Sequence, residues 1–207
     1  MYGYILELRN KYGPLTPKKP QYPPHKHRTI DHGAKQQIVQ PKDTSPHLYD
    51  KGIKRVQGNF GALLYVGRAV NYRILVALST IVYQQAGETK ETADAIEQLI
   101  DYVATYPDDG ILFRKSDMLL VAHADTGFIN ESKACIRVGA HIFLSENDPK
   151  PILNVPLLTI APIIKNVMAS AAEYEMVALY ITAKNMIPLH NTLIEMGWPQ
   201  PQLPIQI

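Results

Sequence analysis

The hydrophobic spacing of this chain changes abruptly at Pro107-Asp108-Asp109-Gly110, and that change limits the folds open to it. Before this turn, apolar residues recur every three or four positions, which is typical of amphipathic helices. From Ile111 onward, short apolar runs bounded by turn residues indicate β-strands. We therefore expect a mixed α/β fold, in which a small helical region precedes a sheet.

Residues 51–106 predict three helices, each with one apolar face. The second runs from about Tyr72 to Gln85, and the third begins near Thr89, a residue type that suits the N-cap position. The expected apolar faces are Ile53, Val56, Phe60, Leu63 and Leu64 in the first helix; Leu75, Leu78, Ile81 and Val82 in the second; and Ala93, Ile96, Leu99, Ile100 and Val103 in the third.

Residues 111–207 predict a sheet with one long helix. Strands are expected at 111–114, 118–124, 133–144 and 155–160, and a further apolar run begins at Leu203. A helix is expected over residues 171–186, followed by a shorter one over 187–196. Ser170 and Glu173 fit the Ser-x-x-Glu capping box at the start, and Gly197 occupies the usual position after a helix C-terminus.

Residues 1–50 predict a largely irregular, proline-rich and basic tether. Seven prolines fall between Pro14 and Pro46, without apolar periodicity. Such a segment buries too little surface to offset the entropy of ordering it. Its basic residues suit sliding contact with nucleic-acid backbone, although a solvated linker explains the same composition. The basic residues that we expect to contact nucleic acid are Lys18, Lys19, Lys26 and Arg28.

The composition indicates a cellular compartment but does not identify a class of binding partner. The formal net charge is only +2, so overall charge identifies no ligand class. The single cysteine, Cys135, forms no internal disulfide, which suits a reducing, intracellular (cytoplasmic or nuclear) compartment. No apolar stretch reaches the length of about 18 residues needed to span a bilayer, and no membrane partner is expected. Composition leaves the oligomeric state open.

Two acidic residues are the candidate metal ligands. Asp125 ends the strand expected over 118–124, and Glu175 lies on the packed face of the long helix. Carboxylates in these places suit Mg²⁺ or Mn²⁺ at a phosphodiester, because hydrolysis is aided by hard divalent ions. Alone, Asp125 is equally explained as a turn residue before Thr126-Gly127. Glu175 is equally explained as a residue at the edge of the helix face that reaches water.

Two further interpretations concern the same segment. Asp125-Thr126-Gly127 matches the Asp-Thr-Gly active-site turn of aspartic proteases, whose retroviral forms are dimers, although His123-Ala124 and Phe128 are unusual flanking residues. Strand alternation puts His123 on the same face as Asp125, where it either assists chemistry or is a core histidine with satisfied hydrogen bonds.

The order of several motifs resembles copia-type LTR-retrotransposon Pol polyproteins over nearly the whole chain. Met1-Tyr2-Gly3-Tyr4-Ile5 is similar to a Met-Pro-Gly-Tyr-Ile segment late in the reverse transcriptase, with Tyr2 in place of proline. The other segments that carry the resemblance are Gly61-Ala62-Leu63-Leu64-Tyr65 with Arg68, Ile96-Glu97-Gln98-Leu99 to Tyr102, Ala104-Thr105-Tyr106-Pro107, Ser116-Asp117-Met118, His123-Ala124-Asp125, Gly139 to Ser145, and Ser170 to Glu175.

The resemblance implies a reverse-transcriptase tail and tether over 1–50, a helical connection over 51–110, and a truncated ribonuclease-H-like domain over 111–207. It implies that Asp125 and Glu175 are catalytic metal ligands for cleaving RNA in RNA–DNA hybrids. In the family, a third acid follows a Pro-Ile-Gln-x pattern, matched here by Pro204-Ile205-Gln206-Ile207, after which the sequence ends. With two of four acids present, we expect the chain to be inactive alone, unless Glu131, Glu146 or Asp148 substitutes. The other outcome is a non-catalytic remnant that binds nucleic acid.

Overall fold

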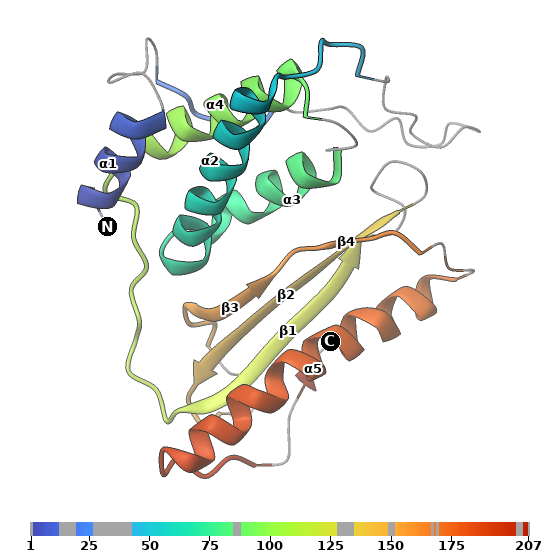
Figure 1. The fold of residues 1–207 in the computed structure, drawn as a ribbon. Helices are drawn as coiled ribbons and strands as arrows, with labels where there is room; N and C mark the ends of the chain where they lie inside the picture. The colour runs from blue at the N-terminus through green and yellow to red at the C-terminus, as the bar shows by residue number, and fades with distance from the viewer. Residues whose placement is uncertain are drawn as a thin grey trace. The chain divides into compact units, whose positions relative to one another are not determined.

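The computed structural model describes residues 2–12, 20–26, 43–84, 88–127, 135–148, 152–166, 168, 170–201 and 205–206. It divides near residue 111 into a helical unit and a unit built on a β-sheet (Figure 1). The chain is therefore mixed α/β, as the sequence predicts. Within the described residues, no helix combines the length and apolar character that crossing a bilayer requires.

The helical unit contains the three helices predicted from the apolar spacing. They are α2 (Asp50–Ala69), α3 (Leu75–Gln84, preceded by the short 3-10 helix η1, Tyr72–Ile74) and α4 (Lys90–Thr105). Leu63, Leu78 and Leu99 are all fully buried, which confirms the expected faces. Val82 is 40% exposed, so its place in the buried face was wrong.

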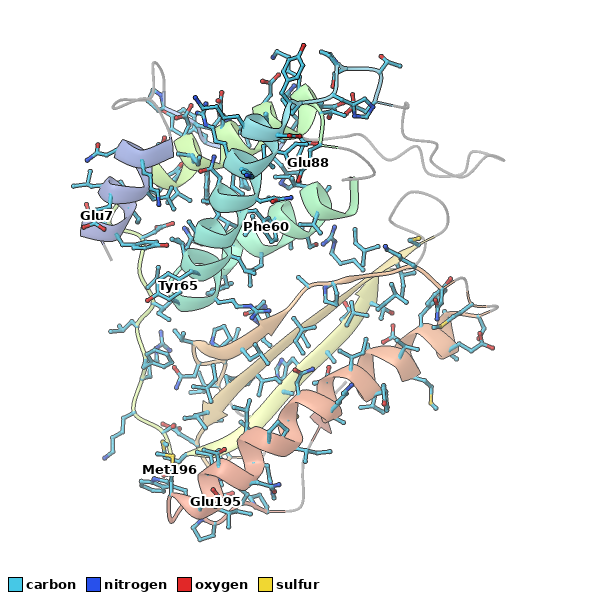
Figure 2. All side chains as sticks on the ribbon, in the orientation of Figure 1. Glu7, Phe60, Tyr65, Glu88, Glu195 and Met196 are labelled. Carbon is cyan, nitrogen blue, oxygen red and sulfur yellow. The ribbon has the colours of Figure 1, made fainter. Side chains whose placement is uncertain are left out.

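Residues 2–12 form a further helix, α1 (Tyr2–Tyr12), where the sequence suggested an irregular segment. Ile5 and Leu8 are buried, and the ring of Tyr4 packs edge-on against that of Tyr65 on α2, 5.2 Å between centroids. Figure 2 labels Tyr65 in this unit. Two buried side chains three positions apart are too short a pattern to predict a helix from sequence. Helix α1 is instead stabilised by packing against α2 and α4.

The start of α4 is fastened to the segment 43–49. Thr89 is the N-cap, as predicted, and its Oγ1 accepts a hydrogen bond from the Thr92 N–H at 3.3 Å. The same hydroxyl donates to Asp43 Oδ2 at 2.5 Å, while the Ser45 N–H donates to Asp43 Oδ1 at 2.8 Å. Lys90 N–H donates to Pro46 O at 3.0 Å. The end of the expected tether is therefore hydrogen-bonded to the helical unit.

This attachment predicts an acid-sensitive contribution to stability. Hydrogen bonds from Thr89 and then Ser45 lower the pKa of Asp43 from 3.8 to about 2. Because the folded-state pKa is the lower one, the stabilisation is fully present above pH 3.8 and is lost as the pH falls through about 2. An NMR titration of the Asp43 carboxyl carbon should give that pKa, and Thr89→Val should move it back toward 3.8. If the pKa of Asp43 were the same in Thr89→Val as in the parent, the hydrogen bond from Thr89 would not be the cause of the lowered pKa.

The sheet unit contains an open sheet with strand order β3-β2-β1-β5, in which β4 also pairs with β2. β1 (Leu119–Gly127) and β2 (Ile136–Ser145) are antiparallel, with Leu119 opposite Ser145 and Gly127 opposite Arg137. The remaining strands are β3 (Pro156–Ile160), β4 (Ile163–Ile164) and β5 (Ile205–Gln206). β5 lies parallel to β1, with Ala122 level with Ile205 and His123 level with Gln206.

Helix α5 (Ala171–Glu195) lies along one face of this sheet (Figure 1). Its buried side chains join those of alternate β1 and β2 residues in one core, which includes Leu120, Ala124, Tyr174 and Met186. Ser170 caps the helix, since its Oγ accepts from the Glu173 N–H at 3.3 Å. Gly197 follows the C-terminus with a φ of 88°, as the sequence predicts.

Two local predictions in this unit were wrong. Residues 171–195 form one helix, not two, and Pro188 lies within it. Packing of Met186 and Leu193 on the sheet holds the helix together across the proline, whose missing N–H would otherwise favour a break. Residues 111–114 form no strand, because the N–H and C=O of Arg114 are both hydrogen-bonded to the side chain of Asn154, at 3.1 Å each.

Candidate carboxylate site at the end of β1

Asp125 lies near the C-terminal end of β1, in a strand and not in a turn. β1 continues through Thr126 to Gly127, all paired with β2, so the predicted turn at Thr126-Gly127 was wrong. Ala122 and Ala124 are buried on the α5 side of the sheet, whereas Asp125 is exposed. Alternation along the strand therefore directs the Asp125 side chain to the face opposite α5, and that of Thr126 toward α5.

Glu175 is held against β1 from the first part of α5. It is partly buried, next to the fully buried Tyr174, and three residues before the buried Ala178. The Thr126 hydroxyl donates to Glu175 Oε1 at 2.7 Å. A carboxylate at the border of a packed face is tolerated when a donor satisfies it, and Thr126 supplies that donor. Glu175 is thus fixed at the same strand end as Asp125.

Thr126 joins the two carboxylates. Its backbone N–H donates to Asp125 Oδ1 at 2.7 Å, and its hydroxyl donates to Glu175 Oε1. The two acids that the sequence singled out therefore contact the same residue, one through its main chain and one through its side chain. From the sequence alone, Thr126 was placed only in a predicted turn and in the Asp-Thr-Gly pattern. Once the strand register is known, alternation directs the Thr126 hydroxyl toward α5, where it can reach Glu175.

The donor set limits the metal that the site can hold. Among the residues that the structure describes, no group of three or more His, Cys, Asp or Glu side chains is arranged to hold a metal ion. Two carboxylates suit a single Mg²⁺ that keeps several of its waters, but a pair of ions requires more ligands. Asp125 and Glu175 approach β1 from opposite faces of the sheet and supply only two carboxylates, which do not fit a two-metal centre.

Two of the three acids named as substitutes lie far from Asp125. Ser145, at the end of β2, is opposite Leu119, which lies six residues before Asp125. A strand rises about 3.3 Å per residue, so this end of the sheet is roughly 20 Å from Asp125. Glu146 and Asp148 follow Ser145 directly and lie at that far end. Glu131 is outside the described residues.

The predicted nucleic-acid contacts fall mainly outside the described part of the chain. Lys18, Lys19 and Arg28 are not among the described residues, and Lys26 is exposed. Cys135, the single cysteine, is buried. Comparison with protein-family models, curated proteins and solved structures finds no match to this chain.

The Thr126–Glu175 contact is expected to carry measurable free energy. Hydrogen bonds to charged groups contribute about 1.5–3 kcal/mol, and partial exposure of this one should reduce the value to about 1 kcal/mol. Thr126→Val and Glu175→Gln should therefore show a coupling of about 1 kcal/mol in a double-mutant cycle measured by urea unfolding. Thr126→Ser, which keeps the hydroxyl, is the control. Strictly additive effects of the two substitutions would show that the contact does not form in solution.

Proposed function

We propose that this chain is a fragment of a retrotransposon Pol polyprotein whose sheet unit is a ribonuclease-H-like domain without independent nuclease activity. The ancestral reaction is the metal-dependent hydrolysis of RNA in an RNA–DNA hybrid. Support comes from a strand that carries Asp125 and a long helix that carries Glu175, with both acids bound to Thr126. These are the two positions that the family resemblance implies for catalytic acids.

The register of β5 on β1 is the observation that carries the proposal. The resemblance implies a third acid one residue after the Pro204-Ile205-Gln206-Ile207 pattern, at position 208. Because Gln206 is level with His123 in parallel register, a residue two positions beyond Gln206 is level with Asp125. An acid at position 208, if it continued this register, would lie at the same strand end as Asp125 and Glu175.

The carboxylates explain both the ancestry and the expected inactivity. A pair of bound divalent ions would activate water and stabilise the leaving oxygen at a phosphodiester. Here Asp125 and Glu175 would be the only protein ligands for such an ion, and the Thr126 hydroxyl donates to one oxygen of Glu175. Each 1.36 kcal/mol of lost transition-state stabilisation slows a reaction about tenfold. Loss of one ion from a two-ion mechanism is therefore expected to leave little activity.

Substrate recognition would rest on shape and charge. Proteins recognise the minor groove of A-form duplexes mainly through backbone and 2′-hydroxyl contacts. Lys18, Lys19, Lys26 and Arg28 would add contacts with phosphates, since cations attract nucleic-acid backbone whatever its sequence. A non-catalytic role in binding nucleic acid is the second candidate, and the exposure of Lys26 is compatible with it.

The aspartic-protease interpretation has little structural support. That chemistry requires the Asp-Thr-Gly segment in an active-site turn, where two aspartates share a proton. In this chain Asp125, Thr126 and Gly127 are in a strand and are paired with Gly139, Val138 and Arg137. The Thr126 hydroxyl is also committed to Glu175. We therefore retain the nuclease ancestry.

The proposed ion site can be tested without catalysis. Mn²⁺ added to the ¹⁵N-labelled protein should broaden the amide signals of Thr126 and Glu175 first, because a paramagnetic ion acts on nearby nuclei. Asp125→Asn should remove this effect, while Asp117→Asn, a second aspartate of the sheet unit, should leave it unchanged. Broadening that persists in Asp125→Asn would place the ion elsewhere and contradict the proposed ligand set.

A cleavage assay tests the register argument directly. The parent chain, shown by circular dichroism to be folded, should not cleave a labelled RNA–DNA hybrid in Mg²⁺ or Mn²⁺. A chain extended by aspartate at position 208 should gain metal-dependent cleavage, and the same extension with asparagine should not. Asp125→Asn in the extended chain should abolish the gain. Cleavage by the parent that depends on Asp125 would show that two acids suffice and would contradict the proposed inactivity.

A further inference from the structure

Gly139 lies inside β2, directly opposite Asp125 of β1. Both residues are exposed. Val138 and Ala140, on either side of Gly139, belong to the α5 core, so position 139 faces away from α5, as Asp125 does. Directly opposite residues on one face of a sheet have Cβ atoms about 4.5–5.5 Å apart. A side chain at position 139 would therefore stand immediately beside the Asp125 carboxylate.

Neither the backbone conformation nor local packing explains glycine at this position. The φ of Gly139 lies outside the left-handed region that favours glycine. A Cβ added here would meet one atom within 4 Å, the Asp125 carbonyl oxygen at 3.9 Å, which is an ordinary contact. Glycine weakens a strand, and inside one it often marks a bulge, a tight bend or the close approach of a ligand. The continuous pairing of β1 with β2 excludes a bulge on that side.

A bend in β2 is the structural alternative. Near Gly139 the second partner of β2 changes, since Arg137 pairs with β4 and Ala140 pairs with β3. If this change required glycine, any side chain at position 139 would destabilise the sheet. If glycine instead leaves room for a ligand, a side chain would stabilise the strand and obstruct the ligand. The two explanations therefore predict opposite changes in stability.

Two of the positions next to Asp125 on this face are glycines. Along β1, the next residue on the same face is Gly127, which like Gly139 has no side chain. Arg137, opposite Gly127, donates from Nη1 to Ala161 O at 3.0 Å. Ala161 follows β3, on the side of β2 away from β1, so this guanidinium is directed away from Asp125. Side chains at these neighbouring strand positions therefore do not cover the carboxylate.

The room beside Asp125 suits a phosphodiester bridged by a divalent cation. A carboxylate and a phosphate are both anions, so a cation must lie between them for the two groups to associate. Mg²⁺ holds oxygen ligands at about 2.0–2.1 Å, so the opposite oxygens of a hydrated ion are about 4 Å apart. A side chain about 5 Å from Asp125 would fill that room, whereas glycine leaves it to the ion and the phosphate.

We propose that Gly139 is the position over which the sugar-phosphate backbone of an RNA–DNA hybrid approaches Asp125, on the face of the sheet opposite α5. This inference rests on the proposed function, because it names the path by which that substrate reaches the carboxylate. Gly139 is an access residue, since it acts by leaving space and not by contact with reacting atoms. The missing side chain weakens β2 but keeps this path open.

Urea unfolding of the whole chain separates the access role from the bend. Gly139→Val should raise the urea midpoint, because β-branched residues favour strands and an added Cβ meets no close contact. Gly139→Ala should not lower the midpoint. A lower midpoint in Gly139→Ala would show that the backbone needs glycine at this position, and would overturn the proposal.

Binding of a labelled RNA–DNA hybrid, measured by fluorescence anisotropy in Mg²⁺, tests access itself. Gly139→Leu should weaken binding about tenfold or more, the loss expected for one charge-assisted contact, and Gly139→Ala should weaken it less. Gly61→Leu is the matched control, since an added Cβ at this α2 glycine meets no atom within 4 Å. It should bind as the parent does. Equal losses in Gly61→Leu and Gly139→Leu would overturn the proposal.

Asp125→Asn distinguishes failure of this inference from failure of the proposed function. In the Asp125→Asn background, Gly139→Leu should weaken binding no further, because both substitutions act on the same contact, and additive losses would overturn the proposal. A parent that binds through Asp125 and is unaffected by Gly139→Leu would contradict this inference alone. A parent that does not bind the hybrid, or binds no better than Asp125→Asn, would contradict the proposed function and this inference together.

Discussion

The register between β1 and β2 determines the chemistry of both faces of the sheet. Nine residue pairs, from Leu119–Ser145 to Gly127–Arg137, are in continuous antiparallel register. A slip of one residue would exchange the two faces. Asp125 would then point toward α5, and His123 would enter the apolar core. Burial of Leu120, Ala122 and Ala124 against α5 opposes that slip, because the slipped register would bury His123 and Asp125 in their place.

The side of α5 that packs on the sheet matches this register. Tyr174, Ala178 and Thr182 are four residues apart and all buried, so one stripe of the helix lies on the sheet. Glu175 follows Tyr174 and lies at the border of that stripe, where Thr126 reaches it from the α5 face of β1. Tyr174 also anchors the approach to the helix, because its hydroxyl accepts a hydrogen bond from the Met168 N–H at 3.1 Å. A strand and a helix distant in sequence thus place two acids at one strand end.

Local features were predictable from the sequence, and features that depend on pairing were not. The side chains of Thr89 and Ser170 each accept a hydrogen bond from the backbone N–H three residues further on, and both N-cap predictions are confirmed. Helix α1 was missed because its stability comes from packing against residues far along the chain. The strand at 111–114 was wrong because a strand requires a partner, and Asn154 takes that place. Asp125 and Glu175 both contact Thr126, and that shared contact emerges only from the strand register.

The position of each polar group along β1 determines which face of the sheet it occupies. Alternation separates residues 125 and 126 onto opposite faces, yet Thr126 has a main-chain donor near the plane of the sheet and a side-chain donor toward α5. Thr126 therefore contacts both Asp125 and Glu175, although these two side chains approach β1 from opposite faces of the sheet. His123 and His141 lie further along the ladder, where β1, β2 and β3 continue on either side. There the sheet keeps the two faces apart, and both imidazoles lie on the face opposite α5.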